Sequence, residues 1–302
     1  MFARTRCVFG MSLCLALLLT AGCGLHAQPT EKDVVYGTVG DAKLLLDVYR
    51  PTTPGPHPAV IAIHGGAWRT GDKSMHRRLG DLLAGGGVAC FAVDYRLAPK
   101  YKWPAQALDV AQAVRWVRAH AKQYDVDPER LAAWGESAGG HLSLMLGTMK
   151  PGDYQEPDDP NNALSARVQC VADFYGPADF TVADKWPRMI VIGLEGFIGA
   201  SPKVDPGKWA DASPVTHVTA DAAPTIIIQG DADRLNPPQQ SQTMKAALDK
   251  AGVEDQIVIV KGAGHGLKGG DPTEVKQAYL AAFTFLAKHL GFTLPKNAGL
   301  VQ

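Results

Sequence analysis

The sequence predicts an α/β fold around a mainly parallel sheet, because two patterns alternate along it. Short runs that are apolar at nearly every position are separated by longer segments, such as AQALDVAQAVRWVRAHAKQY, whose apolar residues recur at helical spacing. Runs of the first kind are typical of strands buried on both faces, as in parallel sheets with helices on each side. The ligand site is then expected at the carboxyl ends of the strands. The runs assigned to these strands are PAVIAIHGG, GVACFAVDY, RLAAWGES, VQCVADFYG, PTIIIQGD and QIVIVKGAG.

Two segments depart from this alternation within a single expected catalytic domain, residues 30–295. VVYGTV and KLLLDVYR precede the first parallel run and predict a hairpin. The stretch from about 176 to 223 is rich in Pro, Trp, Phe and Gly, and loops of that length are usually functional or disordered. Its aromatic content opposes disorder, so we expect a small inserted cap over the site. The aromatic residues are Phe180, Trp186, Phe197 and Trp209.

The charge balance argues against a polyanionic partner. The chain has 302 residues, 46% of them hydrophobic, which is enough to bury a large core. Lys+Arg and Asp+Glu both number 30, so the formal net charge is +0 and provides no broad attraction to nucleic acid or an anionic membrane surface. The expected partner is a small molecule or a neutral polymer.

The N-terminus predicts export. Arg4 and Arg6 precede an apolar segment, Val8 to Leu19, which is too short to span a bilayer comfortably but is typical of a signal-peptide core. We assign residues 1–22 to a signal peptide. The protein is therefore expected to be periplasmic, secreted or lipid-anchored at the bacterial envelope.

The end of this segment offers two cleavage sites. LTAGC at 19–23 resembles a bacterial lipobox, in which Cys23 would be acylated and become the mature N-terminus. Thr20 stands where leucine is usual, so ordinary cleavage after Ala27 stays an alternative. Cys90 and Cys170 lie in apolar runs without basic neighbours and are interpreted as buried core residues.

The motif GESAGG places Ser137 where an apolar run ends and a helical pattern begins. Serine is a good helix N-cap, but a cap does not need Gly135, Gly139 and Gly140. Glycine in a first helical turn costs up to about 1 kcal/mol relative to alanine. A sharp strand-to-helix turn that presents a nucleophile does require small neighbours, so we interpret Ser137 as the nucleophile.

A serine nucleophile needs a base, because its hydroxyl is protonated at neutral pH. His265 in GAGHG follows the last predicted strand, and the glycines around it let a loop carry the imidazole over the site. His141 is the local rival. It lies one turn after Ser137 on the same helix and should point back along that helix, so we interpret it as structural.

The base in turn needs a carboxylate to hold its tautomer. GDADRLNP provides Asp233, our choice, and Asp231 in reserve; either could instead cap a helix that begins near Pro237. The developing oxyanion needs backbone amides. HGGAW ends a strand with two glycines, and we expect the oxyanion hole from three amides, those of Gly66, Ala67 and Ala138.

Five motifs, HGGAW, DYRLAP, GESAGGHL, GDADRLNP and GAGHG, together resemble the esterase branch of the α/β-hydrolase superfamily. The likeness is to the hormone-sensitive-lipase-like carboxylesterases and the acetylxylan/feruloyl esterase-like group, over about residues 34–290. It implies the α/β-hydrolase fold and the roles assigned above: nucleophile Ser137, acid Asp233 and base His265, with the three oxyanion amides.

The chain departs from the family pattern at two positions. Ala67 stands where a third glycine is usual, which keeps the amide but adds a methyl group to the pocket floor. Gln229 stands where histidine often precedes GDAD, and we expect little effect on the chemistry. The resemblance also implies that His64 organises its loop, and that the strands holding Cys90 and Cys170 are not neighbours.

The resulting hypothesis is a serine carboxylic ester hydrolase that needs no metal or organic cofactor. Short-acyl or aryl esters, including acetyl or feruloyl esters of plant polysaccharides, are the expected substrates. Three aromatic side chains are candidates for substrate contact, Trp68, Trp186 and Phe197. A serine peptidase or amidase with the same triad and a non-catalytic binding protein on this fold remain alternatives; a lipase is less favoured, because no long apolar lid follows the signal.

Overall fold

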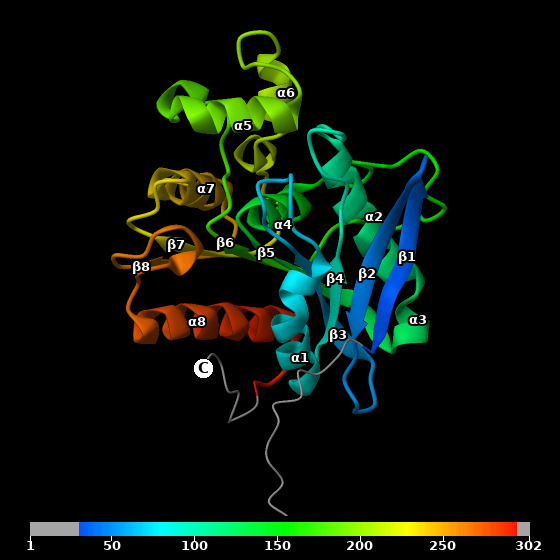
Figure 1. Ribbon diagram of the computed structural model, residues 1–302. Coiled ribbons are helices and arrows are strands. Elements are labelled where there is room, and N and C mark those ends of the chain that lie inside the picture. The colour runs from blue at the N-terminus through cyan, green and yellow to red at the C-terminus, as the bar shows by residue number, and fades with distance from the viewer. Residues whose placement is uncertain (1–29, 295–302) are drawn as a thin grey trace, which may run out of the picture.

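A computed structural model describes residues 30–294 of the chain. The sheet has eight strands in the order β1-β2-β4-β3-β5-β6-β7-β8 (Figure 1). β2 is antiparallel to β1 and to β4, and the strands from β4 to β8 run parallel. The predicted α/β class, the N-terminal hairpin and the mainly parallel sheet are confirmed. The strands are β1 (Glu31–Val39), β2 (Ala42–Tyr49), β3 (His57–Ile63), β4 (Ala89–Val93), β5 (Val126–Glu136), β6 (Cys170–Phe174), β7 (Thr225–Gly230) and β8 (Asp255–Val260).

Helices connect the strands and cover both faces of the sheet. They are α1 (Arg77–Gly85), α2 (Ala105–Ala119), α3 (Ala121–Tyr124), α4 (Ala138–Thr148), α5 (Arg188–Ile198), α6 (Pro206–Asp211), α7 (Pro238–Ala251) and α8 (Pro272–Leu290). Short 3-10 turns are η1 (Lys73–His76), η2 (Ala183–Lys185), η3 (Pro214–His217) and η4 (His265–Leu267). No helix in the range 30–294 is long and apolar enough to cross a membrane.

Alternate residues of each central strand enter two separate hydrophobic cores. In β3, Ile61 and Ile63 pack into the core shared with α2, α4 and α7, whereas Val60 and Ala62 pack into the core shared with α1 and α8. All four side chains are fully buried. Burial on both faces explains why these runs are apolar throughout rather than alternating.

The two described cysteines are free and buried, as expected from the sequence. Cys90 lies in β4 and Cys170 in β6, and β3 and β5 stand between them in the sheet. Both therefore contribute to the core rather than to a cross-link.

The connection from β6 to β7 carries η2, α5, α6 and η3, over the range for which the sequence predicts a cap. Figure 1 shows α5 and α6 above the rest of the domain. Phe197 and Trp209 of this segment are fully buried. Its aromatic residues therefore join the core shared with α2, α4 and α7 and tie the segment to the domain.

Candidate active site

The turn between β5 and α4 holds Ser137 in a strained backbone conformation, with φ 54° and ψ −116°. A non-glycine residue rarely adopts a positive φ, so the surroundings must impose it. The Ser137 amide donates to the carbonyl of Phe174 (2.8 Å), and its carbonyl accepts from the amide of His141 (2.9 Å). These bonds hold the hydroxyl at the carboxyl edge of the sheet.

The glycines around Ser137 are required by close packing. A Cβ on Gly135 would overlap the backbone of Gly139, and one on Gly139 would overlap the carbonyl of Ile63 at the end of β3. A Cβ on Gly140 would overlap the carboxylate of Asp173. The small residues thus let α4 start directly against the strand ends, as the motif predicts.

His265 lies between Ser137 and Asp233. Its Nε2 is 2.9 Å from Ser137 Oγ, and its Nδ1 is 2.8 Å from Asp233 Oδ2. An ionised carboxylate only accepts hydrogen bonds, so Nδ1 carries the hydrogen and Nε2 is left to accept from the serine hydroxyl. The ring of Tyr175 packs edge-on against the imidazole at 5.0 Å. The structure therefore brings together the three residues named from the sequence.

The carboxylate of Asp233 is fully buried and is held from several sides. Its Oδ1 accepts from the amides of Leu235 and Asn236, both at 2.9 Å. Burial alone would raise its pKa, but the hydrogen bonds from His265 and from these amides outweigh burial, so the pKa of Asp233 is lowered. Asp231, the alternative candidate for the acid, instead accepts from the amide of Gly262 at 2.6 Å.

Gln229, which replaces the usual histidine, belongs to the support of this carboxylate. Its Nε2 donates to the carbonyls of Gly230 (3.0 Å) and Asn236 (3.2 Å) and lies 3.5 Å from Asp233 Oδ2. Its Oε1 accepts from the hydroxyl of Ser241 at 2.8 Å. The side chain is fully buried and satisfied, so the substitution keeps the loop around Asp233 ordered.

The loop after β3 has the backbone expected of an oxyanion hole. Gly66 and Ala67 both have positive φ, 114° and 52°. The Gly66 carbonyl accepts from the amides of Arg69 and Thr70, and a Cβ on Gly66 would overlap the carbonyl of Thr70. Ala138 is the first residue of α4, where amides have no acceptor within the helix. Amides of this kind are available to an anion, and the partial positive charge at the helix N-terminus adds to them.

A cavity of about 470 Å³ lies over these groups. Ser137, His265, Gly66 and Ala67 line it, together with apolar side chains from the segment between β6 and β7. Its remaining lining residues are Gly65, Trp68, Thr70, Met75, Glu136, Tyr175, Pro177, Trp186, Ile190, Leu194, Leu235, Asn236 and Gly266.

The three aromatic candidates for substrate contact have different positions. Trp68 and Trp186 line this cavity, but Phe197 does not, so its assignment as a substrate contact is wrong. Phe197 is completely buried and stacks on Trp68, with ring centroids 4.1 Å apart. It supports the tryptophan from behind rather than facing the cavity.

His141 is structural, as expected, and connects the loop after β3 to the segment beyond α6. The Trp68 indole only donates, so its Nε1 contact at 3.1 Å makes His141 Nδ1 the acceptor. Nε2 then donates to the carbonyl of Ala212 at 2.8 Å. Complete burial lowers the pKa of His141 from 6.5 to about 3. His64, whose Nδ1 lies 2.7 Å from its loop's Gly65 carbonyl, has a pKa of about 4 for the same reason.

Several residues of the site were not identified from the sequence. Tyr175, Leu235 and Asn236 line the cavity, and Asn236 also donates to the Tyr175 carbonyl at 3.0 Å. Tyr175 directly follows the end of β6, and that position at a strand terminus was the signal available. Within residues 30–294 no group of three His, Cys, Asp or Glu side chains could hold a metal ion.

The sheet order and a serine held at the sharp turn after β5 define the α/β-hydrolase class of proteins. A family profile described as BD-FAE matches residues 46–248, well over half of the chain, and the chain belongs to that family.

Known proteins similar to this chain include both curated sequences and solved structures. The probable carboxylic ester hydrolase LipM of Mycobacterium tuberculosis is 38% identical over 70% of this chain and 50% of its own length. A truncated carbohydrate esterase from gut microbiota is 28% identical, with a TM-score of 0.75, over 86% of this chain and 96% of that one. The propionate-bound esterase Est2 of Thermogutta terrifontis is 27% identical, with a TM-score of 0.74, over 90% and 98%. The matched chain spans about half the length of LipM and of the two similar M. tuberculosis esterases, LipQ and LipC.

The two aspartates of GDAD provide a matched test of the acid. Asp233→Asn should leave the fold intact but lower kcat for a good substrate by about 10⁴-fold, because an amide favours the wrong tautomer of His265. Asp231→Asn should stay within a few-fold of wild type, since an amide oxygen can still accept from Gly262. Steady-state kinetics on both purified variants would measure this, and equal losses would contradict the assignment.

Burial of neutral His141 predicts an acid-sensitive fold. Its folded pKa of about 3 lies below the value of 6.5 for an exposed histidine, so the unfolded chain binds the proton first as pH falls. Stability should be greatest above pH 6.5 and decrease toward pH 3, by up to about 1.4 kcal/mol per pH unit. His141→Gln should flatten this slope in urea unfolding measured from pH 7 to 4. Curves that stay parallel to wild type would rule out this role for His141.

Proposed function

We propose that the protein is a serine carboxylic ester hydrolase acting on short-acyl or aryl esters, with acetyl or feruloyl esters of plant polysaccharides as candidate natural substrates. The observation that carries the proposal is the continuous hydrogen-bonded row of Ser137, His265 and Asp233 at the floor of a cavity. Family membership and the esterases among its relatives support the same reaction.

In the proposed reaction, His265 Nε2 takes the proton from Ser137 Oγ as the oxygen attacks the ester carbonyl. Buried, ionised Asp233 stabilises the imidazolium that forms. The amides of Gly66, Ala67 and Ala138 bind the oxyanion, an interaction commonly worth a few kcal/mol. The tetrahedral intermediate collapses, the alcohol leaves with the proton from His265, and water then releases the acid by the same steps in reverse order.

The lining of the cavity suits an apolar acyl group. Trp186, Ile190 and Leu194 line the cavity together with Ser137, and Ala67 lines it as well. The similar Thermogutta esterase has been solved with propionate and with butyrate bound, which supports a short acyl chain here. The carbohydrate esterase among the structural neighbours supports a carbohydrate ester.

Ser137→Ala tests the reaction directly. The purified mature protein should hydrolyse p-nitrophenyl acetate and butyrate faster than the decanoate. In a second assay it should hydrolyse acetylated xylan or methyl ferulate. The variant should lose at least about 10³-fold in kcat, since only the oxyanion hole and binding remain. Retained activity would refute Ser137, and a folded wild type inert on all esters would favour the amidase or binding-protein alternatives.

Export and lipid anchoring are part of the same proposal. Residues 1–22 and Cys23 lie outside the described residues, so the proposal rests on the sequence pattern alone. The mass of the mature protein purified from bacterial membranes should correspond to an acylated N-terminal Cys23. A mature chain that begins at Gln28 without acyl groups would contradict the anchor but keep export.

A further inference from the structure

The end of β6 and the turn that follows it, residues 174–176, are bonded to both the nucleophile and the loop of the acid. The Phe174 carbonyl accepts from the amide of Ser137 at 2.8 Å. The next carbonyl, that of Tyr175, accepts from the side-chain amide of Asn236 at 3.0 Å. The backbone amide of Asn236 in turn donates to Asp233 Oδ1 at 2.9 Å. Two adjacent carbonyls of this β6 turn therefore hold the serine and the segment that carries the aspartate.

Asp173 holds the β6 turn from inside the fold. It is the last residue of β6 but one and is fully buried, and its Oδ1 accepts from the amide of Gly176 at 3.0 Å. A Cβ on Gly176 would overlap both this oxygen and the amide of His141 in α4. The turn is therefore packed against a strand on one side and against α4 on the other, which leaves it little freedom to shift.

Tyr175 is held in this turn with a positive φ of 45°. For a bulky residue such a conformation is an outlier, and it persists only where the surroundings impose it. Hydrogen bonds on both sides of the residue impose it here. The Tyr175 amide donates to the Ile228 carbonyl of β7 at 2.8 Å, and the Tyr175 carbonyl takes the bond from Asn236. The backbone thus fixes the point from which the Tyr175 ring extends to His265.

The imidazole of His265 requires a contact beyond its two hydrogen bonds. Its loop, GAGHG, is rich in glycine, and its side chain is 25% exposed. The bonds to Ser137 and Asp233 fix the line through the two ring nitrogens, but not the tilt of the ring about that line. Those two partners occupy the ends of the line, so Tyr175 contacts the imidazole from the side, with 65° between the ring planes. Among residues 30–294 it is the one aromatic ring against His265.

We propose that Tyr175 is a positioning residue of the triad, whose ring fixes the tilt of the His265 imidazole so that Nε2 faces Ser137 Oγ. The inference rests on the proposed function and assigns no proton transfer to Tyr175. The ring acts through the alignment of base and nucleophile, and a misplacement of about 1 Å there lowers the rate strongly. Because the ring makes the contact, the phenol hydroxyl is not required.

Removal of the ring should therefore change kcat rather than KM. Tyr175→Leu should lower kcat for p-nitrophenyl acetate at least about ten-fold and leave KM within about three-fold of wild type, because the ester still binds beside a misaligned base. Tyr175→Phe keeps the ring and should restore kcat to within about three-fold of wild type. Tyr175 also lines the catalytic cavity, so a change in KM alone would make it a substrate contact and would overturn the proposal.

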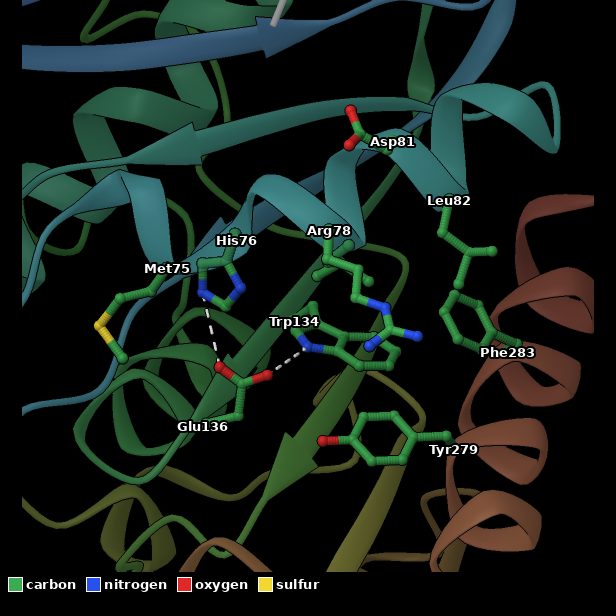
Figure 2. A pocket seen from close by; sticks show the side chains of 10 residues that line it. Met75, His76, Arg78, Asp81, Leu82, Trp134, Glu136, Tyr279 and Phe283 are labelled. Atoms are coloured by element: carbon green, nitrogen blue, oxygen red, sulfur yellow. Dashed lines mark hydrogen bonds and ion pairs between the residues drawn. The ribbon is translucent and has the colours of Figure 1, made fainter. Parts of the chain in front are cut away.

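Tyr279→Leu is the matched control for lost packing. The Tyr279 ring lies on α8 and packs against Phe174 at the end of β6, with centroids 4.9 Å apart. It lines a separate cavity of about 470 Å³ between α1 and α8 and does not line the catalytic one (Figure 2). The variant should lower the melting temperature but keep kcat within about three-fold of wild type. A loss of kcat equal to that in Tyr175→Leu would show that packing alone is responsible and would overturn the proposal.

Tyr175→Gly is the second variant, for the case in which Tyr175→Leu does not fold. Glycine adopts a φ of 45° without strain, so the backbone of the β6 turn is kept while the ring is lost. The same loss of kcat at nearly constant KM is expected. Wild-type kcat in this folded variant would overturn the positioning role.

Crystal structures of the variants separate this proposal from the proposed function, because they report the imidazole without turnover. In Tyr175→Leu the imidazole should be tilted, with Nε2 beyond hydrogen-bond distance of Ser137 Oγ, whereas Tyr175→Phe should keep the wild-type arrangement. If wild type hydrolyses no ester but this difference is seen, the proposed function fails and the positioning role stands. If esters are hydrolysed but the imidazole is unmoved in Tyr175→Leu, the positioning role fails and the proposed function stands.

Discussion

The site depends on one packing constraint, the close approach of the start of α4 to the ends of β3 and β5. Gly139 lies so close to the Ile63 carbonyl that no side chain fits between them. Because of this close approach, the turn holds Ser137 at a positive φ. The serine hydroxyl then lies at the carboxyl edge of the sheet. Strain of this kind costs of order 1–3 kcal/mol and persists only where the surroundings over-determine it. In this protein the surroundings that impose the strain are the two buried cores, one on each face of the sheet.

The same packing sets the electrostatics of the site. The end of β3 is followed within a few residues by the positive-φ loop at Gly66 and Ala67, so its amides and the first amide of α4 lie at one edge. Asp233 stays ionised although buried, because His265 and two backbone amides compensate its lost hydration. His141 stays neutral because the effect of burial outweighs the hydrogen bond to the Ala212 carbonyl, which would favour the charged form. In the site, the buried carboxylate that faces His265 is thus charged, whereas the buried histidine behind Trp68 is neutral.

Sequence reasoning recovered the parts of this arrangement that are local in the chain. The fully apolar runs identify the strands, and the triad follows because each member sits just after one of them in a position that turn chemistry makes recognisable. The sequence favours Asp233 over Asp231 as the acid but does not exclude Asp231, because both residues follow β7. The fold shows that Asp233 is the one that reaches His265. Phe197 was misassigned because aromatic content does not say which ring faces a cavity and which supports it from behind. The cavity between α1 and α8 could not be predicted, because its lining comes from η1, α1, β5 and α8, and these elements meet only in the fold.

The position of Glu136 connects the nucleophile to the lining of the catalytic cavity. As the residue between Gly135 and Ser137, it lies on the strained turn itself, and its carboxylate is anchored by Trp134 two residues earlier. A substrate group that bonds to Glu136 is therefore positioned by the same rigid turn that fixes the nucleophile. Positioning of this kind matters because the reaction rate is sensitive to misplacement of about 1 Å between the reacting atoms.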